Sequence, residues 1–376
     1  MSTIHWVEAH TTHAARWHSE SGAPAPRRVV VADDRTRADT AYRLACEGTA
    51  LLWRGDYHGG RRLLEALGRR LDRKPPRVGG DPADSFRLHR RARGHRARVL
   101  GRVLLVLEDD HVLALRRAPD VRRACAEAYG PPRGAVAIAF RELLGVIGAH
   151  HWRLKGVPVP ALDARIHPHY GVFSPVRGEY VDLVARAPLP WPTGRGAART
   201  AFDLGTGTGV LAAVLARRGV DRVVGTDVNA RAVACARENI DRLGLTGRVE
   251  ATGPELFPEG RADLVVCNPP WLPARPTSAV EQGVYDPDGR MLHSFLAGLA
   301  DRLEPAGEGW LVLSDLAERL GLRTRDELLA AVAAAGLRVV GRHDTRPRHP
   351  RARDAADPLH AARAAEVTSL WRLSPA

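Results

Sequence analysis

Two hydrophobic patterns alternate along the chain from residue 199 onwards. Short apolar runs such as RTAFDL, RVVGTD, RVEAT and ADLVVCN have the length and composition of buried strands. Between the first of them lie GVLAAVLARRG and ARAVACARENIDRLG, in which the apolar residues recur at helical spacing. Strands that alternate with helices in this way predict βαβ units and a parallel sheet. The last two strands, LRVVGRHD and VTSLWRL, predict an antiparallel hairpin at the edge of that sheet.

The first part of the chain has a different pattern. Residues 37–73 show leucines at helical spacings, interrupted near Gly59 and Gly60. Mostly helical patterns continue to residue 155, with prolines at the breaks. We therefore expect an α/β protein with a mainly helical, arginine-rich domain over residues 1–155, a connecting segment over 156–180, and an α/β domain over 181–376. The leucines are Leu44, Leu51, Leu52, Leu63, Leu64, Leu67 and Leu71.

Composition narrows the class of protein. The chain has 376 residues, 44% of them hydrophobic, which is typical of a folded globular protein. It contains no apolar run long enough to cross a bilayer, and its start lacks a secretory signal, so we expect a cytoplasmic protein that does not enter a membrane. The four cysteines are far apart, which argues against disulfides and zinc and predicts buried thiols. No histidine pattern points to a metal.

The charge is strongly basic and almost entirely due to arginine. The net charge is +13, and Lys74 and Lys155 are the only lysines. Seven arginines and no acid occur between Phe86 and Arg102, the best candidate for a surface that binds RNA or a ribosome. An exposed helix face would explain the same run, and coding bias in a GC-rich genome would explain the arginine excess.

A glycine-rich segment, FDLGTGTGV, joins the first α/β strand to its helix. The residues of this loop are Gly205, Thr206, Gly207, Thr208 and Gly209, and Asp203 stands two residues before the first glycine. Glycines here let the backbone approach a ligand. Asp227 ends the next strand, where a carboxylate can accept both hydroxyls of a ribose. A dinucleotide site would need a third glycine at Val210, so the spacing favours S-adenosylmethionine.

A third segment ends in an unusual polar and aromatic group. The strand ADLVVC is followed by Asn268, Pro269, Pro270 and Trp271. Together with D-L-G-T-G-T-G and V-V-G-T-D-V-N-A-R-A-V-A-C-A-R-E-N, this segment resembles the successive motifs of class I S-adenosylmethionine-dependent methyltransferases that methylate amino groups. With V-Y-D-P-D-G-R-M-L, Val284 to Leu292, it is most similar to the HemK/PrmC family of glutamine N5-methyltransferases.

The resemblance covers about residues 165–340 and implies a fold, a cofactor and roles for particular residues. The fold is a Rossmann-like sheet of seven strands, mostly parallel, and the cofactor is S-adenosyl-L-methionine. Asp203 and the glycine loop would contact its methionine part, Asp227 its ribose, and Glu255 and Leu256 its adenine. Val228 and Asn268 would also bind the cofactor, and the domain over residues 1–155 would recognise the substrate. Phe173 and Arg177 would form the lip of the pocket.

The same resemblance gives the Asn-Pro-Pro-Trp segment its chemistry. An amide or exocyclic amino nitrogen is a poor nucleophile because its lone pair is delocalised. The side-chain oxygen of Asn268 and the backbone carbonyl of Pro269 can draw its hydrogens out of plane and direct the lone pair at the methyl group. Proline fixes the direction of that carbonyl, and Trp271 would stack on the planar acceptor. A rigid turn at a strand end would be the purely structural explanation of this segment.

Four functions follow, in order of preference. The first is N-methylation of a glutamine or asparagine amide in a protein of the translation machinery. The second is N-methylation of an exocyclic base amine in ribosomal or other RNA, with the arginine run holding phosphate. The third is a non-catalytic RNA-binding or assembly factor that retained the fold. The last is a nicotinamide oxidoreductase, which the Val210 position disfavours.

Overall fold

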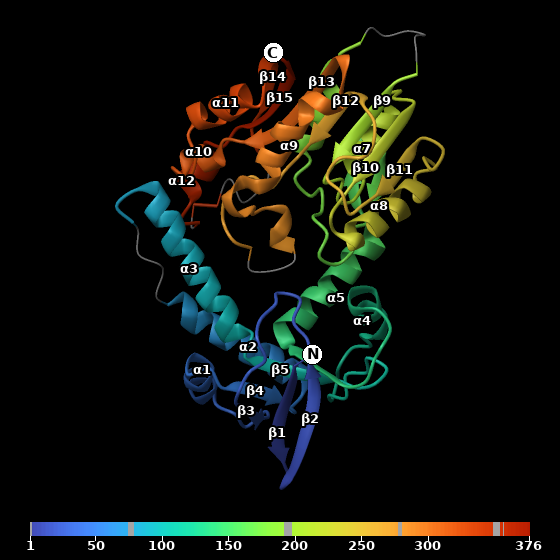
Figure 1. Cartoon of the computed structure of the whole chain (residues 1–376). Coiled ribbons are helices and arrows are strands. Elements are labelled where there is room, and N and C mark those ends of the chain that lie inside the picture. The colour runs from blue at the N-terminus through green and yellow to red at the C-terminus, as the bar shows by residue number, and fades with distance from the viewer. Residues whose placement is uncertain (1, 74–78, 192–197, 277–279, 349–353, 356) are drawn as a thin grey trace. The chain divides into compact units, whose positions relative to one another are not determined.

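The computed structural model describes residues 2–73, 79–191, 198–276, 280–348, 354–355 and 357–376. The chain divides into two compact units, one within residues 1–79 and 87–151 and the other within residues 80–86 and 152–376. Two of the three boundaries fall inside helices, one in α3 (Pro82–Leu100) and one in α5 (Phe140–Lys155). Figure 1 labels these two helices and most of the other elements. Where the structure describes the chain, no helix is both long and apolar enough to span a membrane.

The first unit is built around a sheet, so the prediction of a mainly helical domain was wrong. Its six strands have the order β1-β2-β6-β5-β4-β3. The pairs β1/β2 and β5/β6 are antiparallel, and the other three pairs are parallel. The strands are β1 (Thr3–Glu8), β2 (Thr11–Trp17), β3 (Val29–Ala32), β4 (Ala50–Trp53), β5 (Val103–Leu107) and β6 (Val136–Ala139). The helices wholly inside this unit are α1 (Ala38–Cys46), α2 (Tyr57–Asp72) and α4 (Arg122–Tyr129).

The error has a physical cause in the length and burial of the strands. Every residue of β4 and β5 is buried, so ALLW and VLLVL show no alternation between apolar and polar positions. A short apolar run of this kind cannot be distinguished from a buried helical segment by periodicity. Leu51 and Leu52 therefore lie in a strand, and Gly60 lies inside α2. A side chain on Gly60 would collide with the ring of Phe140, which explains a glycine within that helix.

The second unit contains a seven-stranded sheet with the order β11-β10-β9-β12-β13-β15-β14. The strands from β11 to β13 are parallel, and β15 is antiparallel to both of its neighbours, as expected for a parallel sheet closed by a C-terminal hairpin. The strands are β9 (Thr200–Leu204), β10 (Arg222–Thr226), β11 (Val249–Thr252), β12 (Ala262–Cys267), β13 (Leu303–Ser314), β14 (Leu337–Thr345) and β15 (Thr368–Pro375).

Helices cover both faces of this sheet (Figure 1). Successive residues of β9 face opposite sides, with Ala201 in one core and Phe202 in the other. Residues of α6, α7 and α8 fill the first core, and residues of α9 and α11 fill the second. The helices of the unit are α6 (Glu179–Arg186), α7 (Val210–Arg217), α8 (Ala230–Arg242), α9 (Arg290–Arg302), α10 (Leu316–Arg319), α11 (Arg325–Ala334) and α12 (His360–Ala364).

The predicted connecting segment belongs to the second unit. It contains β7 (Val157–Val159), the 3₁₀ helix η1 (Pro160–Leu162) and β8 (Ala164–Ile166), and β7 and β8 pair with each other. Val159, Leu162 and Ile166 are buried in the same core as α7. The segment is therefore packed structure rather than a linker. Of the four cysteines, three are buried as expected, but Cys46 is exposed.

Candidate functional site

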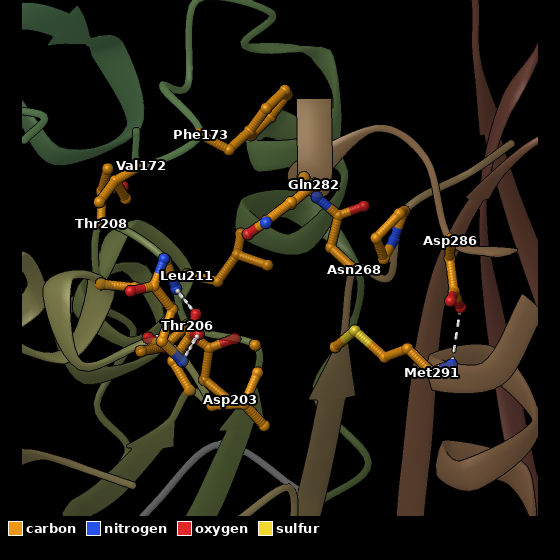
Figure 2. A pocket seen from close by; sticks show the side chains of 18 of the residues that line it. Val172, Phe173, Asp203, Thr206, Thr208, Leu211, Asn268, Gln282, Asp286 and Met291 are labelled. Carbon is orange, nitrogen blue, oxygen red and sulfur yellow. Dashed lines mark hydrogen bonds between the residues drawn. The ribbon is translucent and has the colours of Figure 1, made fainter. Parts of the chain in front are cut away.

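Three strands of the second sheet end at the same level, and the residues that follow them form a cavity. Leu204, the last residue of β9, pairs with Thr226 of β10 on one side and with Cys267 of β12 on the other. The chain therefore delivers Gly205, Asp227 and Asn268 to one edge of the sheet. All three line a cavity of about 590 Å³, which Figure 2 shows from close by. This volume is in the range of small-molecule sites, and the carboxyl ends of parallel strands are where such sites form.

Four residues of the glycine loop, Gly205, Thr206, Gly207 and Thr208, line the cavity. Gly205 has φ +70° and Gly209 φ +79°, a region that disfavours other residues. A Cβ atom on Gly205 would come within 2.5 Å of the Met291 methyl group, whereas one on Gly207 would meet nothing closer than 3.9 Å. Thr206 and Thr208 are buried and also line the cavity. The loop thus leaves open backbone facing the cavity, which suits close contact with a ligand.

Asp203 is almost fully buried beneath this loop. Its Oδ2 atom accepts hydrogen bonds from the hydroxyl of Thr206 at 2.6 Å and from the backbone N–H of Ala212 at 3.0 Å. Burial raises the pKa of Asp203 to about 6, and the nearby negative charge of Asp227 acts in the same direction. Asp203 therefore holds the loop against α7. It also lines the cavity as a carboxyl group whose pKa lies above its ordinary value.

Asp227 stands where β10 leads into α8, at the side of the cavity. Its Oδ2 accepts a hydrogen bond from Gly207 N–H at 3.0 Å, and its Oδ1 accepts one from Asn229 N–H at 2.9 Å. Burial raises the pKa of this carboxyl as well. Val228 follows, 70% exposed, and also lines the cavity. Each carboxylate oxygen keeps a second lone pair, so Asp227 can still accept two hydroxyl groups.

The Asn-Pro-Pro-Trp segment begins directly after β12. Asn268 and Pro270 line the cavity, and Asn268 points into it in Figure 2, but Pro269 and Trp271 are not among the lining residues. The indole N–H of Trp271 donates a hydrogen bond of 2.9 Å to Oδ1 of Asn268. The partly buried ring of Trp271 packs against both cores of the unit. In this structure the ring therefore supports Asn268 and does not form a wall of the cavity.

Besides Pro269 and Trp271, three expected site residues do not line the cavity, namely Gly209, Glu255 and Arg177. Glu255 is exposed and does not line it, whereas the neighbouring Leu256 does. The backbone carbonyl of Leu256 accepts a hydrogen bond from the hydroxyl of Thr226, which turns this residue inward. Arg177 does not line the cavity either, because its guanidinium group lies 3.6 Å from the buried carboxylate of Glu366.

Phe173 does form part of the lip, as expected, and it is held by a close approach of the chain. Phe173 lines the cavity together with Gln282 and Gly283 of the 3₁₀ helix η2 (Val280–Gly283). A Cβ atom on Gly283 would lie 2.7 Å from the Cβ of Phe173. The two segments therefore meet across the mouth with no room for a side chain between them.

Several lining residues had no assigned role in the sequence. Asp286 accepts a hydrogen bond from the backbone N–H of Met291 at 2.6 Å, and both belong to the VYDPDGRML segment. That segment was noted for its resemblance but gave no indication of which residues would face a ligand. Gln282 had no sequence signal at all. The residues that were missed are Gly171, Val172, Tyr180, Val210, Leu211, Asn229, Ala232, Gln282, Gly283, Asp286, Arg290, Met291 and Ser294.

The site offers acids, amides and backbone groups rather than metal ligands. In the part of the chain that the structure describes, no group of three or more His, Cys, Asp or Glu residues could hold a metal ion. The open glycine backbone and the two acids at neighbouring strand ends fit a nucleoside with a cationic amino-acid tail.

Comparison with known proteins places this site in a family of domains. Residues 163–319 match the model of the methyltransferase small domain. The ribosomal protein L11 methyltransferase of Tolumonas auensis is 32% identical over 123 residues, which are 32% of this chain and 42% of that protein. The release factor glutamine methyltransferase of Cereibacter sphaeroides is 35% identical over 147 residues, which are 38% of this chain and 49% of that protein. The chain thus spans less than half the length of these two relatives.

Solved structures similar to this chain include the ribosomal protein L11 methylase of Lactobacillus delbrueckii subsp. bulgaricus. Its sequence identity is 17%, the TM-score is 0.38, and the match covers 57% of this chain and 86% of that one. The match to the methyltransferase small domain contains Asp203, the glycine loop, Asp227 and Asn268. This part of the chain is therefore a class I S-adenosylmethionine-dependent methyltransferase domain with an α/β Rossmann-like fold, and its cofactor is S-adenosylmethionine.

Proposed function

We propose that the protein is an N-methyltransferase that acts on a planar NH2 group, namely the side-chain amide of a glutamine or asparagine in a protein of the translation machinery. The observation that carries this proposal is the position of Asn268. It follows β12 and lines the same cavity as the glycine loop and Asp227. An amide oxygen at this place can accept a hydrogen bond from an N–H group of the methyl acceptor at the edge of the cofactor site.

The proposed chemistry needs few protein groups. S-adenosylmethionine supplies a methyl group on a positively charged sulfur. Asn268 Oδ1 accepts one hydrogen of the acceptor NH2 group. The carbonyl of Pro269, which follows Asn268 but does not line the cavity, would accept the other, and the two together orient the lone pair. Asp203 and the loop hold the amino-acid end of the cofactor, and Asp227 holds its ribose. No strong base is required before attack, because the nitrogen becomes acidic only once it carries the methyl group.

A protein acceptor is supported by the two relatives, whose names state a ribosomal protein and a release factor as their targets. Nucleic acid is the second candidate, because α3 exposes arginines. Arg91, Arg93 and Arg98 are exposed on this helix, and the net charge of the chain is +13. If those arginines bind RNA phosphates, affinity for RNA falls steeply between low and moderate salt.

Labelling separates the two classes of acceptor. The protein is incubated with tritiated S-adenosylmethionine and a lysate from a strain that lacks its gene. We expect label that protease releases and ribonuclease leaves in place. Label that only ribonuclease removes would identify nucleic acid as the acceptor instead.

Substitution of Asn268 tests the assigned chemistry. We expect Asn268→Ala to lower the rate of transfer by roughly 100-fold or more, the typical cost of removing one preorganised polar group. Calorimetry with S-adenosylhomocysteine should show an affinity within several-fold of wild type, since the loop and Asp227 remain. Asn268→Asp keeps an acceptor oxygen and should retain more activity than Asn268→Ala. An Asn268→Ala protein with wild-type activity would refute the role of this amide.

A further inference from the structure

Within the candidate site, the hydrogen bond between Trp271 and Asn268 determines which way the asparagine amide faces. The indole N–H can only donate, and the side-chain oxygen of an asparagine can only accept. The 2.9 Å contact therefore holds Oδ1 of Asn268 on the side of Trp271. Its Nδ2 group, which can only donate, must then face away from the indole. A hydrogen bond of this kind removes the freedom of the amide to turn over by 180°.

The tryptophan is itself well held. Its ring is partly buried and contacts both hydrophobic cores, one on each face of the sheet. Asn268 and Trp271 are separated by two prolines, whose rings fix the backbone φ angles between them. The donor that orients Asn268 is therefore anchored in the core, although Asn268 itself lines the cavity.

We propose that Trp271 is a positioning residue that fixes the Asn268 amide for recognition of the methyl acceptor; this inference rests on the proposed function. With one lone pair of Oδ1 taken by the indole, the other is left for an acceptor N–H. Nδ2 is then available to an oxygen or ring nitrogen beside that N–H. A primary amide carries an N–H donor and a carbonyl oxygen acceptor in one plane. It can therefore form two hydrogen bonds with Asn268, one to Oδ1 and one from Nδ2. An aliphatic amine has no such acceptor atom and does not fit.

Phenylalanine at this position isolates the hydrogen bond from the packing. Trp271→Phe keeps an aromatic ring against the two cores but removes the donor, so the Asn268 amide becomes free to take both orientations. Trp191→Phe is the matched control, because Trp191 is also partly buried against the first of those cores and lies outside the cavity.

The first measurement needs no substrate. Protein with ¹⁵N-labelled tryptophan gives one indole N–H signal per tryptophan, and the signal of Trp271 is the one missing from Trp271→Phe. We expect the chemical shift of this signal to change in Asn268→Ala. In Asn268→Asp it should stay close to the wild-type value, because the carboxylate can still accept the hydrogen bond. A Trp271 signal that is unchanged in Asn268→Ala would overturn the proposal.

The second measurement is the rate of tritium transfer into the deletion-strain lysate. We expect Trp271→Phe to lower the rate about tenfold, which corresponds to the free-energy contribution of one neutral hydrogen bond. The affinity for S-adenosylhomocysteine should stay within twofold of wild type. Trp191→Phe should change neither quantity. In an Asn268→Asp background both side-chain oxygens accept, so the loss caused by Trp271→Phe should shrink.

The outcomes separate the two proposals. A Trp271→Phe protein with the wild-type rate would overturn the positioning role and leave the methyltransferase assignment standing. A wild-type protein that labels no amide or base nitrogen, while its Trp271 signal still responds to Asn268→Ala, would refute the proposed function and the positioning role with it.

Discussion

Two carboxylates lie at neighbouring strand ends, yet the structure gives them different environments. Asp203 is 1% exposed and accepts hydrogen bonds from a threonine hydroxyl and from a backbone N–H of α7. Asp227 lies closer to solvent and accepts hydrogen bonds from two backbone N–H groups in loops. Deep burial without a cationic partner favours the neutral form of a carboxyl group. Asp203 is therefore the group whose charge should respond to pH and to a bound cation.

The pKa of Asp203, raised by burial to about 6, predicts a pH dependence of cofactor affinity. The carboxyl is mostly protonated at pH 5 and mostly ionised at pH 7, and in the proposed function only the ionised form attracts the ammonium group of the cofactor. Calorimetry with S-adenosylhomocysteine should therefore show an affinity about tenfold higher at pH 7 than at pH 5.

The sign is opposite for the ligand-free fold. Because the folded pKa lies above the ordinary value of 3.8, the stability associated with neutral Asp203 is lost as the pH rises from about 4 to 6. Asp203→Asn should remove most of the pH dependence of binding, whereas Asp301→Asn on an exposed position of α9 should leave it unchanged. A flat affinity profile in wild type would contradict the assignment.

At the scale of elements, the mouth of the cavity depends on two segments that carry no regular pattern. The chain around Phe173 and the short helix η2 approach each other so closely that position 283 admits only a hydrogen atom. This contact keeps Phe173 and Gln282 at the cavity. In the proposed function, the strand ends supply the cofactor side of the site, and these irregular segments supply the side that the acceptor approaches.

Gly283→Ala tests this contact. The added methyl group would lie 2.7 Å from the Cβ of Phe173, so one segment must move, at a cost of about 1–3 kcal/mol. We expect a lower melting temperature and roughly tenfold slower transfer, with S-adenosylhomocysteine affinity changed much less. Gly145→Ala in α5 is the control, since a Cβ there meets no atom within 4 Å. Unchanged transfer by Gly283→Ala would show that the contact does not shape the acceptor side.

At the scale of the whole molecule, the order of residues along the chain does not follow the division into units. Residues 80–86 belong to the second unit although they precede most of α3. Phe86 is 3% exposed and buried in a cluster with Leu272, Leu316 and Leu320. Leu272 directly follows Trp271, so this early segment of the chain supports the turn that carries Asn268.

Phe86→Ala should therefore weaken both the fold and the site. Removing a buried phenylalanine costs about 3–5 kcal/mol of unfolding free energy. We expect a marked fall in thermal stability together with slower methyl transfer measured below the melting temperature. Phe140→Ala removes an equally buried ring from the first unit and should lower stability while leaving S-adenosylhomocysteine affinity intact. Wild-type transfer by Phe86→Ala would show that the turn does not depend on this cluster.

The sequence by itself determined the parallel part of the second sheet and which strand-end residues meet at its edge. Strands such as β9 and β10 are flanked by glycine loops, caps and helical stripes, which are local signals. Because parallel strands end at one edge, the residues after them were predicted to meet, and Gly205, Asp227 and Asn268 do.

Only the tertiary structure decided the rest. The strands of the first unit are short and buried on both faces, so no local period distinguishes them from helix. Gln282 and Asp286 reach the cavity through irregular segments, and Glu255 misses it while its neighbour Leu256 enters. The bond from Trp271 to Asn268 depends on where a packed ring places one N–H group. Such details depend on contacts between distant segments, and these contacts produce no periodic pattern in the sequence.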